Sequence, residues 1–171
     1  MTDKTYFATL AAYNRWANAR LYAAAETLGE SARTADRQGF FGSIHNTLNH
    51  IMVGDRLWLS RFPGQPAYRY KLDDVPYPDF GELKAARVAQ DQVFIDFLAA
   101  MTPDYLAGDL SYTNTRGETF TMPVRLVLGH VFNHQTHHRG QVHHMIGMAG
   151  MGAGTEPPSI DLIYYLREVG I

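Results

Sequence analysis

Apolar residues recur at helical spacing in four long segments of the chain, separated by stretches rich in polar residues, glycine and proline. These segments are residues 3–28, 43–62, 79–101 and 123–149. The first is rich in alanine, which favours a helix, and Ser43 and Asp79 stand where their side chains can cap the second and third. The fourth runs into the glycine-rich residues 147–154, a typical helix end. The pattern therefore predicts four long helices.

The segments between these helices predict less regular structure. Residues 30–42 are polar and contain glycine, so we expect a connector there. Residues 63–78 hold four prolines and three tyrosines, which is irregular, and they are long for a connection in a bundle. In residues 109–122, apolar residues alternate with threonine and other polar residues on either side of a turn sequence, which predicts a short β-hairpin. Ser159 can cap a last short helix over residues 160–168.

Together these elements predict an all-α fold, a four-helix bundle against which the hairpin packs. An orthogonal packing of the same helices is the alternative, and the pattern does not give the order of the helices in a bundle. The 171 residues suffice for one hydrophobic core, and no repeat or linker divides them. We therefore expect a single domain over residues 1–171.

Charge and composition narrow the classes of function. The net charge of −2, with both signs mixed along the chain, argues against nucleic acid or anionic lipid as a partner. No apolar run is long enough to span a bilayer, and the first residues lack the features of a secretory signal, so we expect a cytoplasmic protein. Because the chain has no cysteine, it has no disulfides, cysteine nucleophiles or thiolate metal ligands.

Histidines are concentrated in one stretch, because six of the eight fall within residues 130–144. On a helical wheel His134 and His138 lie one turn apart, within or at the edge of the apolar face. The other four lie on a flank of the helix or point away from the core: His130, His137, His143 and His144. Two buried neutral imidazoles both need partners, and one divalent ion satisfies both. Two core histidines bonded to backbone carbonyls are the alternative.

A catalytic metal site built on this pair needs a third protein ligand from another helix. The two remaining histidines, His45 and His50, both lie in the second predicted helix, on either flank of its apolar stripe. Gly54 lies on the flank of His50 and would leave room beside it. The periodicity does not choose between the two, and a partly exposed surface histidine is the alternative for either.

Motifs along the chain resemble those of the DinB family. The clearest is a histidine, His134, followed four residues later by His138-Arg-Gly-Gln. Three segments support it: Leu48-Asn-His-Ile51 with Asp55 and Trp58, Tyr13-Asn-Arg-Trp-Ala-Asn18, and Asp161-Leu-Ile-Tyr-Tyr-Leu-Arg167. The resemblance covers nearly the whole chain, and the motif at His134 is its most specific part.

The resemblance implies a DinB/YfiT-type four-helix bundle that binds a divalent metal, zinc or nickel, through three histidines. Carried onto this sequence, the metal ligands are His50, His134 and His138. It also implies a homodimer, and some relatives resemble transferases or isomerases that use a low-molecular-weight thiol.

Three functions fit such a site. In the leading hypothesis the metal activates a small thiol for transfer to an electrophile, in the context of detoxification, and the missing cysteine is compatible because the thiol arrives as a substrate. A metal-dependent hydrolase is the second; Asp55 is its candidate base, although we expect a solvated or capping role for that carboxylate. A metal-binding stress-response bundle without turnover is the third. No glutamate lies between His134 and His138, which argues against a His-Glu-x-x-His peptidase.

Overall fold

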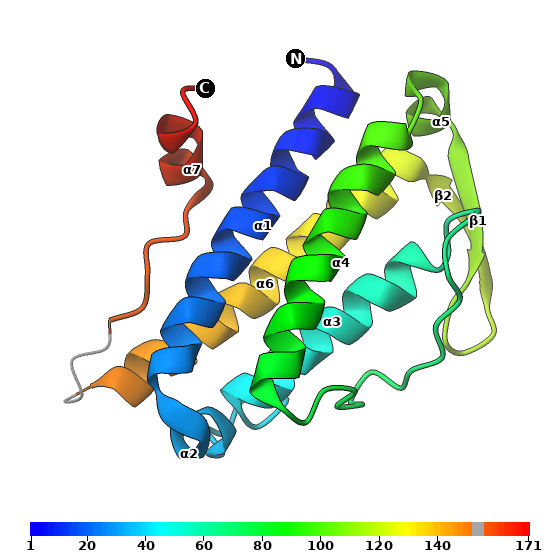
Figure 1. Cartoon of the computed structure of the whole chain (residues 1–171). Helices are drawn as coiled ribbons and strands as arrows, with labels where there is room; N and C mark the ends of the chain where they lie inside the picture. Colours follow the sequence, from blue (N-terminus) through cyan, green and yellow to red (C-terminus); the bar gives the residue numbers. More distant parts are fainter. Residues whose placement is uncertain (152–155) are drawn as a thin grey trace.

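Four long helices dominate the computed structural model, which describes residues 1–151 and 156–171 (Figure 1). They are α1 (Asp3–Thr27), α3 (Ile44–Leu59), α4 (Phe80–Ala100) and α6 (Val124–Gly150). Their number and places confirm the helices predicted from the apolar pattern. No helix in the described part of the chain combines the length and apolar character needed to cross a bilayer.

The starts of α3 and α4 are fixed by the predicted caps. The Ser43 side chain accepts a hydrogen bond from the Asn46 backbone N–H at 3.1 Å, and the Asp79 carboxylate accepts one from Glu82 N–H at 2.8 Å. Each bond satisfies a backbone donor that the first turn of a helix leaves without a partner. At its far end α6 continues into the predicted glycine-rich stop 147–154, of which residues 152–154 lie outside the described residues.

The four long helices form a bundle in which α1 packs against α4 and α6, and α3 packs against α6 and α4. Figure 1 shows α1 and α6 running in one direction and α3 and α4 in the other. Because α3 and α4 run the same way, residues 60–79 form a crossover that returns along the length of the bundle. This crossover explains why residues 63–78 are too long for a simple bundle connection.

The predicted hairpin is present and joins the upper end of α4 to α6. Strands β1 (Asp109–Thr113) and β2 (Thr119–Pro123) pair antiparallel, with Tyr112 opposite Phe120. Gly117 in the turn has a φ of +83°, a conformation that favours glycine. Leu110 is buried against the bundle, so the hairpin closes one end of the core.

Three short helices complete the fold of the described residues. They are α2 (Gly29–Thr34), α5 (Pro103–Ala107) and α7 (Leu162–Glu168). The first occupies part of the predicted connector 30–42, which joins α1 to α3 as expected but begins as a short helix. The last begins after Asp161 and has no side-chain cap, so the predicted cap at Ser159 was wrong. Helices this short span too few turns to show an apolar period.

A layer of buried polar side chains crosses the bundle between its apolar clusters. On α4, Arg87 and Asp91 are each 2% exposed and form an ion pair with a 2.9 Å N–O distance. Val93, an apolar residue of the same helix, is 40% exposed. The face of α4 that packs against the other helices therefore carries charged residues. The positions of the apolar residues alone do not show which side of α4 is buried.

Candidate metal centre

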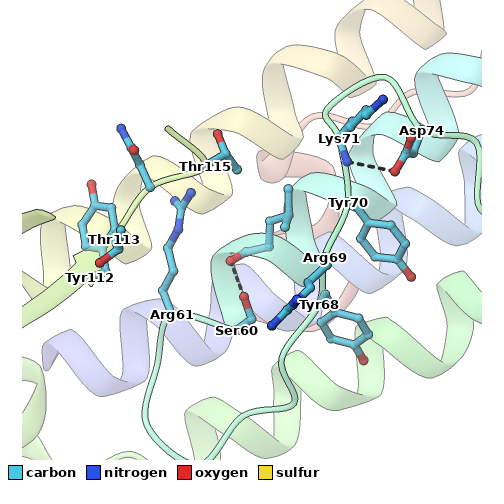
Figure 2. A pocket seen from close by; sticks show the side chains of 12 residues that line it. Ser60, Arg61, Tyr68, Arg69, Tyr70, Lys71, Asp74, Tyr112, Thr113 and Thr115 are labelled. Carbon is cyan, nitrogen blue, oxygen red and sulfur yellow. Dashed lines mark hydrogen bonds between the residues drawn. The ribbon is translucent and has the colours of Figure 1, made fainter. Parts of the chain in front are cut away.

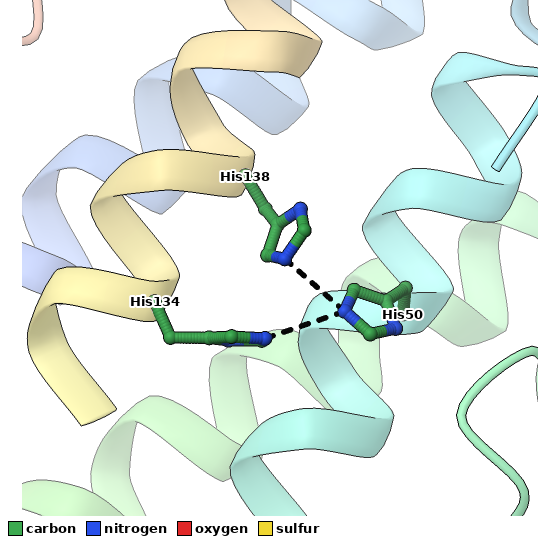
Figure 3. Close-up of side chains that lie close together, drawn as sticks. All are labelled: His50, His134 and His138. Atoms are coloured by element: carbon green, nitrogen blue, oxygen red, sulfur yellow. Dashed lines mark hydrogen bonds between the residues drawn. The ribbon is translucent and has the colours of Figure 1, made fainter. Parts of the chain in front are cut away.

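The structure brings together three histidines from two adjacent helices, His50 on α3 and His134 and His138 on α6 (Figure 3). The Nε2 atom of His50 lies 3.3 Å from Nε2 of His134 and 3.2 Å from Nε2 of His138. One ring nitrogen from each residue lies within 4.8 Å of those of the other two. These are the three residues that the sequence and the family resemblance pointed to, and we call them the histidine triad.

The local sequence explains how the rings meet. His134 and His138 are one turn apart on α6, so both side chains project from the face that packs against α3. Facing them, α3 carries Gly54, where a Cβ atom would lie only 2.8 Å from Cε1 of His134. The glycine therefore provides the room beside His50 that the sequence suggested.

Hydrogen bonds fix the orientation and tautomer of two of the rings. Nδ1 of His50 lies 2.8 Å from the Leu72 carbonyl, and Nδ1 of His138 lies 2.8 Å from Oε1 of Gln141. Both oxygens only accept, so each Nδ1 carries the proton and each Nε2 of the neutral ring presents a lone pair. The lone pairs of His50 and His138 thus face each other at 3.2 Å with no proton between them.

Protonation of one ring would place a hydrogen between these lone pairs, but burial makes protonation of the triad unfavourable. Burial, helped by the neighbouring imidazoles, lowers the pKa of His134 to about 3. Burial also lowers the pKa of His138 to about 4 and moves the pKa of His50 below its usual value. At neutral pH all three rings are therefore uncharged, which is the state in which imidazole binds metals.

The spacing fits a metal ion. Two nitrogens that each lie about 2.0–2.1 Å from a tetrahedral ion are roughly 3.3 Å apart, close to the 3.2 and 3.3 Å found around Nε2 of His50. Three neutral imidazoles suit zinc, nickel, copper or iron, and a set of three protein ligands leaves an open position for a substrate. The histidine triad is thus compatible with a divalent metal of open coordination.

Comparison with known proteins identifies the family, because the sequence model of the DinB family matches residues 1–168. The chain belongs to the DinB family. One relative is Protein DinB of Bacillus subtilis (strain 168), which is 26% identical over 144 residues, covering 81% of this chain and 83% of that protein. The resemblance inferred from the motifs is therefore confirmed.

An aromatic side chain covers one side of the triad in this DinB protein. The Phe41 ring stacks on His50 with a centroid distance of 3.8 Å and an interplanar angle of 20°, and its edge approaches His138 at 5.6 Å. Phe41 could not be predicted from the apolar pattern because it lies in the connector before α3, where no periodicity marks a buried face. The adjacent pair Phe40-Phe41 in a polar segment was the only signal available.

The second histidine of α3 has a different partner. His45 is 5% exposed, and its Nε2 lies 2.9 Å from the Tyr77 carbonyl. Because a carbonyl oxygen only accepts, this nitrogen donates its proton there, and His45 is a core histidine outside the triad. His50 is also 5% exposed, so neither residue is the surface histidine that remained as an alternative.

The remaining histidines of α6 lie around the triad without joining it. His130 packs against Trp58 with ring centroids 4.6 Å apart, and Nε2 of His137 lies 3.2 Å from the Gln141 amide. His143 bonds to the Pro158 carbonyl at 3.1 Å, and His144 is exposed. Composition makes these residues look equivalent to the triad, and only position on the helix separates them.

Asp55 is not the solvated or capping residue that we expected. It is 1% exposed, with Oδ2 at 2.5 Å from Nη1 of Arg87 and Oδ1 at 2.7 Å from Nε2 of Gln135. Both carboxylate oxygens are therefore already engaged in the buried polar layer. This environment gives Asp55 a structural role and offers no free oxygen for a general base.

Proposed function

We propose that this DinB protein binds one divalent metal ion, zinc or nickel, through Nε2 of His50, His134 and His138, and uses it to activate a small thiol for transfer to an electrophile. The observation that carries the proposal is the pair of unprotonated Nε2 atoms that face each other at 3.2 Å in a buried site. In the absence of a proton, a cation between them relieves the repulsion of their lone pairs. A metal ion is the cation that this nitrogen set prefers.

The chemistry follows from the charge of the site. Three neutral imidazoles would leave a divalent ion its full positive charge, and the chemistry such an ion would supply is a lowered pKa for a thiol bound beside the triad. The thiol has to come with the substrate, because the chain contains no cysteine. The reaction would then be an S-transfer in which the sulfur of the substrate thiol forms a bond to the electrophilic carbon and the thiol gives up its proton. In a substitution the bond from that carbon to the leaving group breaks and the leaving group departs with the electron pair; in an addition the neighbouring atom of the electrophile takes up a proton.

The residues around the triad orient its rings and limit the access of water to the site. The Leu72 carbonyl and the Gln141 side chain hold the rings of His50 and His138 so that both Nε2 atoms point to one place. Phe41 covers the face of the His50 ring, which strengthens electrostatic interactions at the site by excluding water.

Thiol transfer is preferred over metal-dependent hydrolysis because the candidate base for hydrolysis, Asp55, has both oxygens engaged by Arg87 and Gln135. An activity measurement distinguishes a metal-binding stress protein without turnover from both enzymes.

We further propose a cytoplasmic homodimer that takes small molecules rather than nucleic acid or membranes as partners. The resemblance to DinB proteins supports the dimer, and the low net charge supports the choice of small molecules.

Metal analysis tests the ligand set. We expect one equivalent of metal in the wild type and a loss of most of it in His50→Ala, His134→Ala and His138→Ala, because removal of one of three ligands opens the site. The matched control is His45→Ala on the same helix, which should keep its metal. Undiminished metal in all three triad variants, or an equal loss in His45→Ala, would contradict the assignment.

Turnover then tests the reaction. Metal-loaded protein should accelerate conjugation for at least one pair in a panel of low-molecular-weight thiols and electrophiles, and protein stripped with a chelator should not. Metal binding without acceleration by any pair would favour the bundle without turnover, and hydrolysis of activated esters by the loaded protein alone would favour the hydrolase.

A further inference from the structure

A cavity of about 730 Å³ lies between the end of α3, the crossover and the hairpin, away from the histidine triad (Figure 2). Three of its lining residues are cationic, Arg61, Arg69 and Lys71, and one is acidic, Asp74. The acidic one is partly engaged, because Oδ2 of Asp74 accepts a hydrogen bond from the Lys71 backbone N–H at 2.8 Å. The cavity is therefore locally positive on a chain whose net charge is −2.

Arg61 is held in place by aromatic rings. Its guanidinium carbon lies 3.8 Å from the ring centroid of Trp58 and 4.9 Å from that of Tyr112. Trp58 is on α3 and Tyr112 is on β1, so two separate elements fix the side chain. Figure 2 shows Arg61 at the side of the cavity next to the hairpin and Arg69 on the opposing loop.

The Arg61 guanidinium has no anionic partner within residues 1–151 and 156–171. Neither an ion pair nor a side-chain hydrogen bond connects it to another described residue, and its half-buried position lowers its pKa. Arg87, a buried arginine of α4, differs because it is paired with both Asp55 and Asp91. A guanidinium that is pre-oriented and partly desolvated but not neutralised has its hydrogen-bond donors available to a ligand.

We propose that this cavity binds a small-molecule anion with a carboxylate or phosphoryl group, and that Arg61 is its principal contact. The planar fork of guanidinium donors matches both groups and can hold two oxygens of either at once. The volume falls within the range of small-molecule sites, roughly 300–1,000 Å³. Arg69 and Lys71 add positive charge at the loop side, and the hydroxyls of Thr113 and Thr115 provide further polar contacts.

The cavity and the triad share structural elements. Leu57 lines the cavity and lies seven residues after His50 on α3, which corresponds to roughly 10 Å along the helix. On the crossover, Lys71 lines the cavity and the next residue, Leu72, bonds to His50. A molecule anchored at Arg61 could thus present its other end to the metal; this last step rests on the proposed function, whereas anion binding does not.

Calorimetric titration of metal-free protein with inorganic phosphate and with succinate tests the proposal, since removal of the metal excludes anion binding at the triad. We expect saturable binding of at least one probe, and binding about tenfold or more weaker in Arg61→Gln, which loses the charged fork. The control, Arg167→Gln, makes the same charge change at an exposed residue of α7. It should alter the affinity less than about twofold.

The probes also distinguish the ligand chemistry. Binding of phosphate alone identifies a phosphoryl site, binding of succinate alone identifies a carboxylate site, and either supports the proposal. Absence of saturable binding in the wild type, or equal weakening in Arg61→Gln and Arg167→Gln, overturns it. Arg61→Lys keeps the charge and loses the planar fork, so its affinity for the anion should lie between those of the wild type and Arg61→Gln. If circular dichroism shows that Arg61→Gln is unfolded, Arg61→Lys takes its place in the test.

Failure of this inference and failure of the proposed function are separable. Arg61→Gln should contain as much metal as the wild type, because Arg61 is not part of the triad. Anion binding by a protein that takes up no metal when metal is supplied would leave the cavity assignment standing and contradict the metal centre. Metal binding by a protein that binds neither phosphate nor succinate would leave the metal centre standing and contradict the cavity assignment.

Discussion

Gly54 sets the space between α3 and the His134 ring. In Gly54→Ala the new methyl group would lie 2.8 Å from Cε1 of His134, a contact that the flexible imidazole relieves by swinging away. We therefore expect metal affinity to fall by about tenfold or more, while the free energy of unfolding changes by only about 1 kcal/mol. Metal competition with a chromogenic chelator and chemical denaturation measure the two effects.

The matched control for this substitution lies on α6. A Cβ at Gly129 meets no atom within 4 Å, so Gly129→Ala should leave metal affinity unchanged and add helix propensity. Equal metal affinity in Gly54→Ala and the wild type would show that metal binding does not depend on the present position of the His134 ring.

At the scale of single residues, the sequence predicted the triad in two unequal steps. The wheel identified His134 and His138 because they lie one turn apart on the apolar face of one helix. It could not separate His50 from His45, since both flank the stripe of α3 and both are in fact buried. What separates them is the neighbour that each meets, α6 for His50 and the Tyr77 carbonyl for His45, and only the family motif pointed to His50.

Among the elements, α4 places two charged side chains, Arg87 and Asp91, on its buried face. In Arg87→Met the carboxylates of Asp55 and Asp91 lose their shared cation while they stay buried. We expect a loss of about 3–5 kcal/mol in the free energy of unfolding, because removal of one partner leaves uncompensated buried charge. Urea denaturation followed by circular dichroism measures this loss.

The control is another cation of the same helix. Lys84 pairs with Glu26 at 2.7 Å in an exposed position, so Lys84→Met should cost no more than about 1 kcal/mol. Similar losses in the two variants would mean that the buried pair contributes little beyond an ordinary surface pair.

The starts of the long helices could be predicted because caps and apolar periods are local features, as at Ser43 and Asp79. The burial of Arg87 could not be predicted, because its partner Asp55 lies on another helix and 32 positions away in the chain. A polar residue in an amphipathic pattern is assigned to the solvent side unless such a partner is known.

For the whole molecule, acid should reduce stability partly through His45. Burial lowers the pKa of His45 in the folded state, whereas the unfolded chain has a value near 6.5. Below about pH 6.5 the unfolded state therefore binds more protons, so the free energy of unfolding falls as the pH decreases until it passes the folded pKa. Above about pH 6.5 this contribution does not change.

Comparison with a variant that cannot titrate isolates this contribution. In His45→Gln the amide can still donate to the Tyr77 carbonyl, so metal-free variant protein should lose stability less steeply than wild type between about pH 7 and pH 5. Denaturation curves of both proteins across that range provide the measurement. Parallel pH profiles would assign the acid sensitivity to other groups.

The arrangement of the helices could be predicted only in part from the sequence. Amphipathic stripes show which face of each helix is buried, but they do not show which helix lies opposite, so the neighbours of α1 and α3 became known from the structure. The one clue to direction was the length of residues 63–78, which suits a crossover between parallel helices better than a turn.

The crossover divides the three candidate ligands between two parts of the chain. A single proteolytic cut within residues 63–78 would leave His50 on the first fragment and His134 and His138 on the second. Neither fragment alone would contain more than two of the three imidazoles. Tight metal binding would then require the fragments to associate, so the ion would bridge a split protein and its affinity would report how completely the bundle has reassembled.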